Sequence, residues 1–212
     1  MTRTFLSREV MSRYDIVLPD LSVYCEPHDR EANRGTRDNY LKALGNIDNF
    51  YEFCLRYPNI RATIGVVDEW YNAGNRARDS HLEGKRNDVG DLLKTRLVDL
   101  DIYDIDNIER LGEILEKPGE LSDVDYELIM VGASCAINQG PTAIMTNDRG
   151  ILRFGMFLSK YLSNDCPAMI LDIFTELDST GNVFRQGDKN DMGLLLCHSA
   201  LRKKYYPTSV FS

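Results

Sequence analysis

Three acidic residues stand where a fold could bring their carboxylates together: Asp20, Asp125 and Asp148. Asp20 follows an apolar run at residues 16–18, and Asp148 follows the short apolar segment 142–145. If both segments are strands of one parallel sheet, these acids share the sheet edge where open α/β sheets bind their ligands. Magnesium and manganese prefer carboxylate oxygens and water as ligands. The residues therefore predict a cation site.

A cation site of this kind suits phosphodiester hydrolysis. One or two bound divalent cations can activate a water and neutralise the charge that develops on phosphorus. The three histidines lie far from the acids in sequence, so neither a zinc site nor a histidine base is indicated: His28, His81 and His198. Three polar residues beside the acids are expected to orient the ligands or to contact phosphate: Ser22, Thr146 and Asn147.

Each acid also has a purely structural interpretation. Asp125 stands three residues after Ser122, as the acid of a capping box does, and Asp148 could cap the helix that follows it. Asp20 could be a turn residue after Pro19. Helix caps have no reason to gather at one place, so the convergence of three acids on one predicted edge favours the cation site.

Hydrophobic patterning predicts the elements that position these acids. Apolar runs indicate strands, and apolar residues at three- and four-residue spacing indicate helices. Strands are expected at 15–24, with Pro19 ending the ladder, at 142–145 and at 166–172. A short strand or an extended segment is expected at 60–67, leading into a helix up to 74. Helices are expected at 38–57, 128–137, 149–162 and 192–205, with two or three more in the charged region 75–119. The acids between Asp99 and Asp106 are expected to form a solvated face. Alternating strands and helices indicate one α/β domain with a mostly parallel sheet, preceded by an arm at residues 1–13.

Composition limits the classes of function. The 212 residues are 43% hydrophobic and 27% charged, as in an ordinary soluble domain. The net charge of −8 argues against a general nucleic-acid coat but allows a nuclease whose acidic pocket is neutralised by metal. Five widely spaced cysteines without a Cys-x-x-Cys pair indicate reduced core residues. No apolar run is long enough for a membrane span, and we expect a cytoplasmic protein.

Four short motifs occur in an order that resembles a PIN domain. They are the hydrophobic-Asp-x-Ser of Asp20 and Ser22, Glu69 after an apolar β-branched run, Leu121-Ser122-x-x-Asp125, and Thr146-Asn147-Asp148-Arg149. The resemblance covers residues 14–24, 60–72 and 120–172. It leaves a helical insertion at 75–119 and a C-terminal loop and helix at 173–212 outside.

The resemblance implies a three-layer α/β/α sandwich and a metal-dependent ribonuclease. The family's four acids fall on Asp20, Glu69, Asp125 and Asp148, which would hold Mg²⁺ or Mn²⁺. Asp123 is a neighbour that could assist or replace Asp125. Glu69 could equally be a surface acid near the start of its helix.

The sequence thus predicts an endoribonuclease that binds RNA as its substrate. Arg149 or the basic cluster at residues 202–204 would contact the RNA backbone, and a homodimer is plausible. Three alternatives stay open: a toxin whose protein partner covers the acidic pocket, a PIN-like binding module without catalysis, and a phosphatase or nucleotide-binding protein. The last lacks support, because the chain has neither a Gly-rich phosphate loop nor an Asp-x-Asp motif after the first strand.

Overall fold

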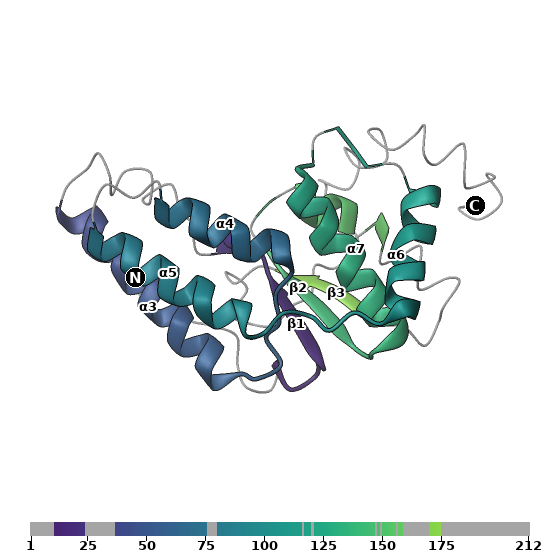
Figure 1. Cartoon of the computed structure of the whole chain (residues 1–212), viewed down its shortest axis with the longest axis horizontal. Helices are drawn as coiled ribbons and strands as arrows, with labels where there is room; N and C mark the ends of the chain where they lie inside the picture. The colour runs from purple at the N-terminus through teal and green to yellow at the C-terminus, as the bar shows by residue number, and fades with distance from the viewer. Residues whose placement is uncertain are drawn as a thin grey trace.

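The computed structural model describes residues 11–23, 37–75, 80–115, 117–119, 121–146, 148, 150–155, 157–158 and 170–174. Its elements follow one another as β1 (Ile16–Pro19), η1 (Leu21–Val23), α3 (Arg37–Arg56), α4 (Ile64–Asn75), α5 (Ser80–Lys94), α6 (Ile102–Ile114), α7 (Asp123–Asn138), β2 (Thr142–Met145) and β3 (Leu171–Phe174) (Figure 1). Residues 150–155 and 157–158 are also helical. The chain is therefore an α/β protein, as predicted. None of the described helices is long and apolar enough to cross a membrane.

The three strands form a parallel sheet in the order β1, β2, β3. Isolated parallel bridges continue this arrangement beyond β1, from Val17 to Ile60 and from Ala62 to Leu97. The chain thus runs outward from β1 on one side and then returns to place β2 and β3 on the other. The direction of winding reverses between β1 and β2, and such a switch point is where open α/β sheets form a crevice.

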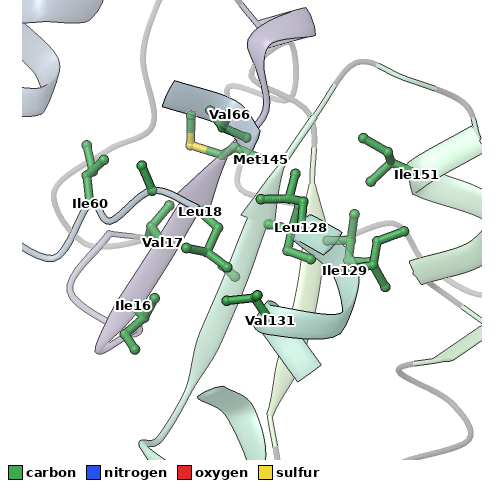
Figure 2. Close-up of a cluster of buried hydrophobic side chains, with 14 of the residues drawn as sticks. Ile16, Val17, Leu18, Ile60, Val66, Leu128, Ile129, Val131, Met145 and Ile151 are labelled. Carbon is green, nitrogen blue, oxygen red and sulfur yellow. The ribbon is translucent and has the colours of Figure 1, made fainter. Parts of the chain in front are cut away.

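The core lies where α7 packs on the strands. All four residues of β1 and of β2 are buried, and so is the α7 segment 128–136 (Figure 2). A Cβ added at Gly132 of α7 would lie only 2.9 Å from Cδ1 of Ile144. The small-residue composition of α7 therefore lets the helix backbone approach β2 closely.

A second group of helices covers the β1 side of the sheet. Figure 1 shows α3, α4 and α5 gathered together, apart from α6 and α7. The rings of Phe50 in α3 and Trp70 in α4 stack with centroids 5.6 Å apart. Arg96 donates to the carbonyl oxygens of Cys54 and Tyr57 at the C-terminal end of α3. Because the last carbonyls of a helix have no partner within it, Arg96 stabilises this end.

The helix α6 is joined to α7 by one buried carboxylate, that of Asp104. Its Oδ1 accepts from Ser134 Oγ at 2.9 Å and Asn138 Nδ2 at 3.1 Å. Its Oδ2 accepts from Gln139 Nε2 at 2.7 Å and from the backbone N–H of Asp101 at 3.2 Å. The prediction of a solvated acidic face over residues 99–106 is thus wrong for Asp104, which is only 1% exposed.

Most other predicted elements are confirmed within the described residues. The helices predicted at 38–57 and 128–137 correspond to α3 and α7, and the region 75–119 contains α5 and α6. The strand predicted at 60–67 is wrong in its second half, because α4 begins at Ile64 and only the bridges at Ile60 and Ala62 are strand-like. The strand predicted at 166–172 overlaps β3 at Leu171–Phe174 but is wrong at Ile170, and its residues 166–169 lie outside the described part of the chain. The arm predicted at 1–13 is wrong at Met11, which is buried in the core, and the strand predicted at 15–24 is wrong at 21–23, which form η1. Residues 1–10, residue 24 and the helix predicted at 192–205 lie outside the described residues.

Candidate functional site

Asp20 lies at the carboxyl end of β1, directly at the switch point of the sheet. The pairing of Pro19 with Met145 brings the next residues of both chains, Asp20 and Thr146, side by side. The backbone N–H of Asp20 donates to the carbonyl oxygen of Met145 at 2.8 Å. Its side chain is buried, with 3% of the residue exposed. The parallel register therefore places a buried carboxylate at the switch point.

Two hydroxyl groups hold this carboxylate. Thr146 Oγ1 donates to Asp20 Oδ2 at 2.8 Å, and Ser22 Oγ donates to the same oxygen. The two hydroxyl oxygens lie 3.2 Å apart. Thr146 Oγ1 also accepts from the backbone N–H of Asp148 at 2.9 Å. Thr146 thus connects the carboxylate of Asp20 with the backbone that carries Asp148.

Asp148 and Asp125 both cap helices. Asp148 Oδ1 accepts from the N–H groups of Gly150 at 2.6 Å and Ile151 at 3.2 Å. Ser122 and Asp125 form a reciprocal capping box at the start of α7, with distances of 3.0 and 3.3 Å. The structural interpretations of both acids are therefore confirmed. Both carboxylates stand at helix N-termini, where the helix dipole favours negative charge.

The starts of these two helices lie close together. A Cβ built on Gly150 would lie 3.0 Å from Cδ2 of Leu121, the residue before the N-cap of α7. The capping acids of the two helices are therefore brought to the same edge as Asp20.

The electrostatics of Asp20 reflect this arrangement. Burial raises the pKa of Asp20 from 3.8 to about 6, against the hydrogen bonds from Ser22 and Thr146, which lower it. The negative charges of Asp125 and Asp148 raise the pKa further. A cation near these carboxylates would relieve both the burial penalty and the mutual repulsion.

The remaining predicted residues are placed as follows. Glu69 is half-buried in the second turn of α4, a helix that contacts both η1 and α7. Asp123 is exposed and forms an ion pair with Lys117. Asn147, Arg149 and the basic cluster at 202–204 lie outside the described residues. Among the residues that the structure places, no three His, Cys, Asp or Glu side chains lie close enough to hold a metal as they stand.

Sequence reasoning missed Glu127, which links α7 to α4. Glu127 Oε1 accepts from the N–H of Gly65, in the first turn of α4, at 3.4 Å. A Cβ on Gly65 would lie 2.5 Å from Glu127 Oε2 and 3.1 Å from Cγ1 of Val124. This close approach sets the helix that carries Glu69 against the helix that carries Asp125. No local pattern relates residues 62 positions apart, so the sequence offered no signal for it.

Comparisons with protein-family models, with curated proteins and with solved structures find no match to this chain. The functional interpretation therefore depends on the residues and their geometry.

Proposed function

We propose that this chain is a PIN-like, divalent-metal-dependent endoribonuclease with the three-layer α/β/α architecture of that family. One observation carries the proposal: the buried Asp20 at the switch point, with its pKa raised partly by the charges of Asp125 and Asp148. Strongly perturbed carboxyl groups in a crevice are typical of functional sites. Five parallel segments around that point, counting the bridged ones, support the architecture.

The donor set fits a hard divalent cation. Asp20, Asp125 and Asp148 offer carboxylate oxygens, and Glu69 on α4 is the fourth acid in this proposal. A bound Mg²⁺ or Mn²⁺ would supply a more acidic water and neutralise negative charge on the scissile phosphate. Ser22 and Thr146 orient the Asp20 carboxylate, and the helix starts stabilise the charges of the other two acids.

The substrate class follows from the resemblance to the PIN family. RNA is the proposed substrate, and Arg149 is the cation proposed to contact its backbone, with the cluster at residues 202–204 as the alternative. Asp123 takes no part in this assignment, because its carboxylate faces solvent and is paired with Lys117.

The experiment that tests the proposal is cleavage of labelled single-stranded and structured RNA with Mn²⁺, Mg²⁺ or EDTA. Wild type is compared with Asp20→Asn and Asp148→Asn, which keep side-chain size and remove charge. We expect cleavage only with metal, reduced on the order of 100-fold or more in both variants. Asp106→Asn, an exposed acid of α6, is the matched control and should cleave like wild type.

A binding module without catalysis is the second candidate. It is allowed by the net charge of −8, which disfavours general binding to a nucleic-acid backbone. Melting curves of the same proteins separate the two candidates. Mn²⁺ that raises the melting temperature of wild type alone, without any RNA cleavage, would favour the module and contradict the nuclease.

A further inference from the structure

The first turn of α6 exposes apolar side chains that the proposed nuclease site does not use. Ile102, Tyr103 and Ile105 are 68%, 69% and 47% exposed. The other large apolar side chains exposed in the described part of the chain lie on separate segments: Leu55, Ile64, Leu97 and Ile170. The start of α6 is therefore where exposed apolar side chains gather.

Acidic residues continue the same surface. Asp106 and Glu109 are exposed one turn beyond Ile102 and Ile105, on the same side of the helix. Arg110 is the single basic residue of α6. We call Ile102, Tyr103, Ile105, Asp106 and Glu109 the α6 patch. Its charge repels a nucleic-acid backbone and attracts a peptide that combines cations with apolar or aromatic side chains.

The α6 patch lies away from the candidate nuclease site. Asp104 fixes the first turn of α6 to Ser134 and Asn138, near the C-terminal end of α7. Asp125 is near the opposite end of α7, roughly 14 Å from Ser134 and roughly 20 Å from Asn138 along the helix at about 1.5 Å per residue. In Figure 1, α7 lies between α6 and the strands. A ligand on the α6 patch therefore leaves the acids at the switch point open.

We propose that the α6 patch docks the chain's own segment Arg202-Lys203-Lys204-Tyr205-Tyr206. Three consecutive cations complement the acids of the patch. Two aromatic rings complement its isoleucines, and Tyr103 offers a ring face to a guanidinium. The sequence from Phe174, the last described residue, to Arg202 can span up to roughly 90 Å when extended. That reach exceeds the width of a globular chain of this size, so the connection permits docking within one molecule.

The docking can be observed with the full-length chain, labelled at the isoleucine δ1 methyl groups, by NMR. Wild type is compared with a variant carrying Arg202→Glu, Lys203→Glu and Lys204→Glu. We expect the signals of Ile102 and Ile105 to move while that of Ile64, which is 64% exposed on α4, stays in place. Asp106→Lys with Glu109→Lys should move the same two signals. Combining both sets of reversals should return them toward their wild-type positions.

A synthetic peptide of residues 200–212 measures the interaction directly. Added to the charge-reversed tail variant, it should restore the wild-type methyl positions. It should bind about tenfold more weakly when Asp106 and Glu109 are also replaced by lysine. Unchanged Ile102 and Ile105 signals in the tail variant would overturn the proposal. So would methyl shifts in wild type that disappear on dilution, because the occupant would then be the tail of a second copy. Neither outcome depends on whether the chain cleaves RNA.

Discussion

Two aspartates of this chain are buried to nearly the same degree and are treated in opposite ways. Asp20 is 3% exposed and Asp104 is 1% exposed. Burial acts to raise the pKa of both carboxyl groups. In Asp104 the hydrogen bonds from Gln139, Ser134 and Asn138 outweigh burial, and the pKa is lowered. In Asp20 burial outweighs the hydrogen bonds from Ser22 and Thr146, and the pKa rises to about 6.

The difference lies in the number of donors, in the charges nearby and in depth, because Asp104 lies beside the exposed residues Asn138 and Gln139. Each oxygen of Asp104 accepts two hydrogen bonds. The donors are the N–H of Asp101 before α6, the side chains of Ser134 and Asn138 in α7, and that of Gln139 after it. Asp20 accepts two hydroxyl groups on one oxygen and faces the charges of Asp125 and Asp148. The fold thus gives the Asp104 carboxylate a hydrogen-bond donor on every side, whereas the Asp20 carboxylate faces the negative charges of Asp125 and Asp148. We infer that Asp104 has a structural role and that Asp20 belongs to the proposed cation site.

The largest effect is expected for Asp104→Asn. The amide removes the charge that the four donors compensate, and its NH₂ group replaces an acceptor oxygen, so hydrogen bonds are lost or must rearrange in a buried place. We expect the free energy of unfolding to fall by about 3 kcal/mol at pH 7, measured by urea denaturation. Asp106→Asn, on the exposed side of the same helix, should change it by less than about 0.5 kcal/mol. A loss in Asp104→Asn as small as that of the control would contradict the structural role.

The pH dependence sharpens this first prediction. Because the folded pKa of Asp104 lies below 3.8, its carboxylate stabilises the fold above that pH. The stabilisation is lost as the pH falls through the folded pKa. The difference in the free energy of unfolding between wild type and Asp104→Asn should therefore become smaller only below pH 3.8.

Replacing Asp20 by asparagine should have the opposite effect and raise the free energy of unfolding. The amide oxygen can still accept both hydroxyl groups, and the unfavourable charge is gone. Because the folded pKa is raised, Asp20 contributes stability below pH 3.8 that is lost as the pH rises through about 6. A shift from 3.8 to about 6 corresponds to about 3 kcal/mol. Asp20→Asn should therefore be more stable than wild type by up to about 3 kcal/mol at pH 8 in EDTA.

Urea denaturation at pH 4 and pH 8 measures this change. The gain should shrink strongly at pH 4, where most of wild-type Asp20 is protonated in the folded state. Asp123→Asn, whose carboxylate is exposed, is the matched control and should not be more stable than wild type at pH 8. A variant that is less stable than wild type at pH 8 without metal would mean that the Asp20 charge is already compensated. The contrast with Asp104 would then fail.

The contrast also shows what the sequence can and cannot specify. The strands β1 and β2, the capping box of α7 and the cap at Asp148 depend on residues within a few positions, and they were predictable. The register of two parallel strands then placed Asp20 beside Thr146. Asp104 was mispredicted because its partners Ser134, Asn138 and Gln139 come 30 to 35 residues later. Its spacing from Asp101 was a capping-box signal that could have indicated a helix start there.

The prediction of a strand where α4 begins was wrong for a related reason. The β-branched run there favours a strand locally, but Thr63 Oγ1 accepts from the N–H of Val66 at 3.4 Å, and Glu127 accepts from that of Gly65. These contacts satisfy N–H groups that a helix start leaves without partners, so tertiary packing overrides the local propensity. Because α4 begins at Ile64, Glu69 lies in its second turn and not near its first turn, where the sequence predicts it.

The smallest expected effect tests how the Asp20 carboxylate is held. Thr146→Val keeps the side-chain shape and removes both the donor to Asp20 and the acceptor of the Asp148 N–H. We expect a loss of about 1 kcal/mol in the free energy of unfolding. The pKa of Asp20 should also rise above about 6, because the Thr146 hydrogen bond lowers it. Carboxyl-carbon NMR of labelled aspartate would follow that titration.

The matched control is Thr142→Val, at the other end of β2. Thr142 is also buried, and its hydroxyl donates to the Gly140 carbonyl oxygen at 2.9 Å, away from Asp20. It should lose a similar amount of stability and leave the pKa of Asp20 unchanged. If both valine variants gave the same Asp20 titration, the hydroxyl groups would have no part in setting it. Burial and neighbouring charge alone would then separate Asp20 from Asp104.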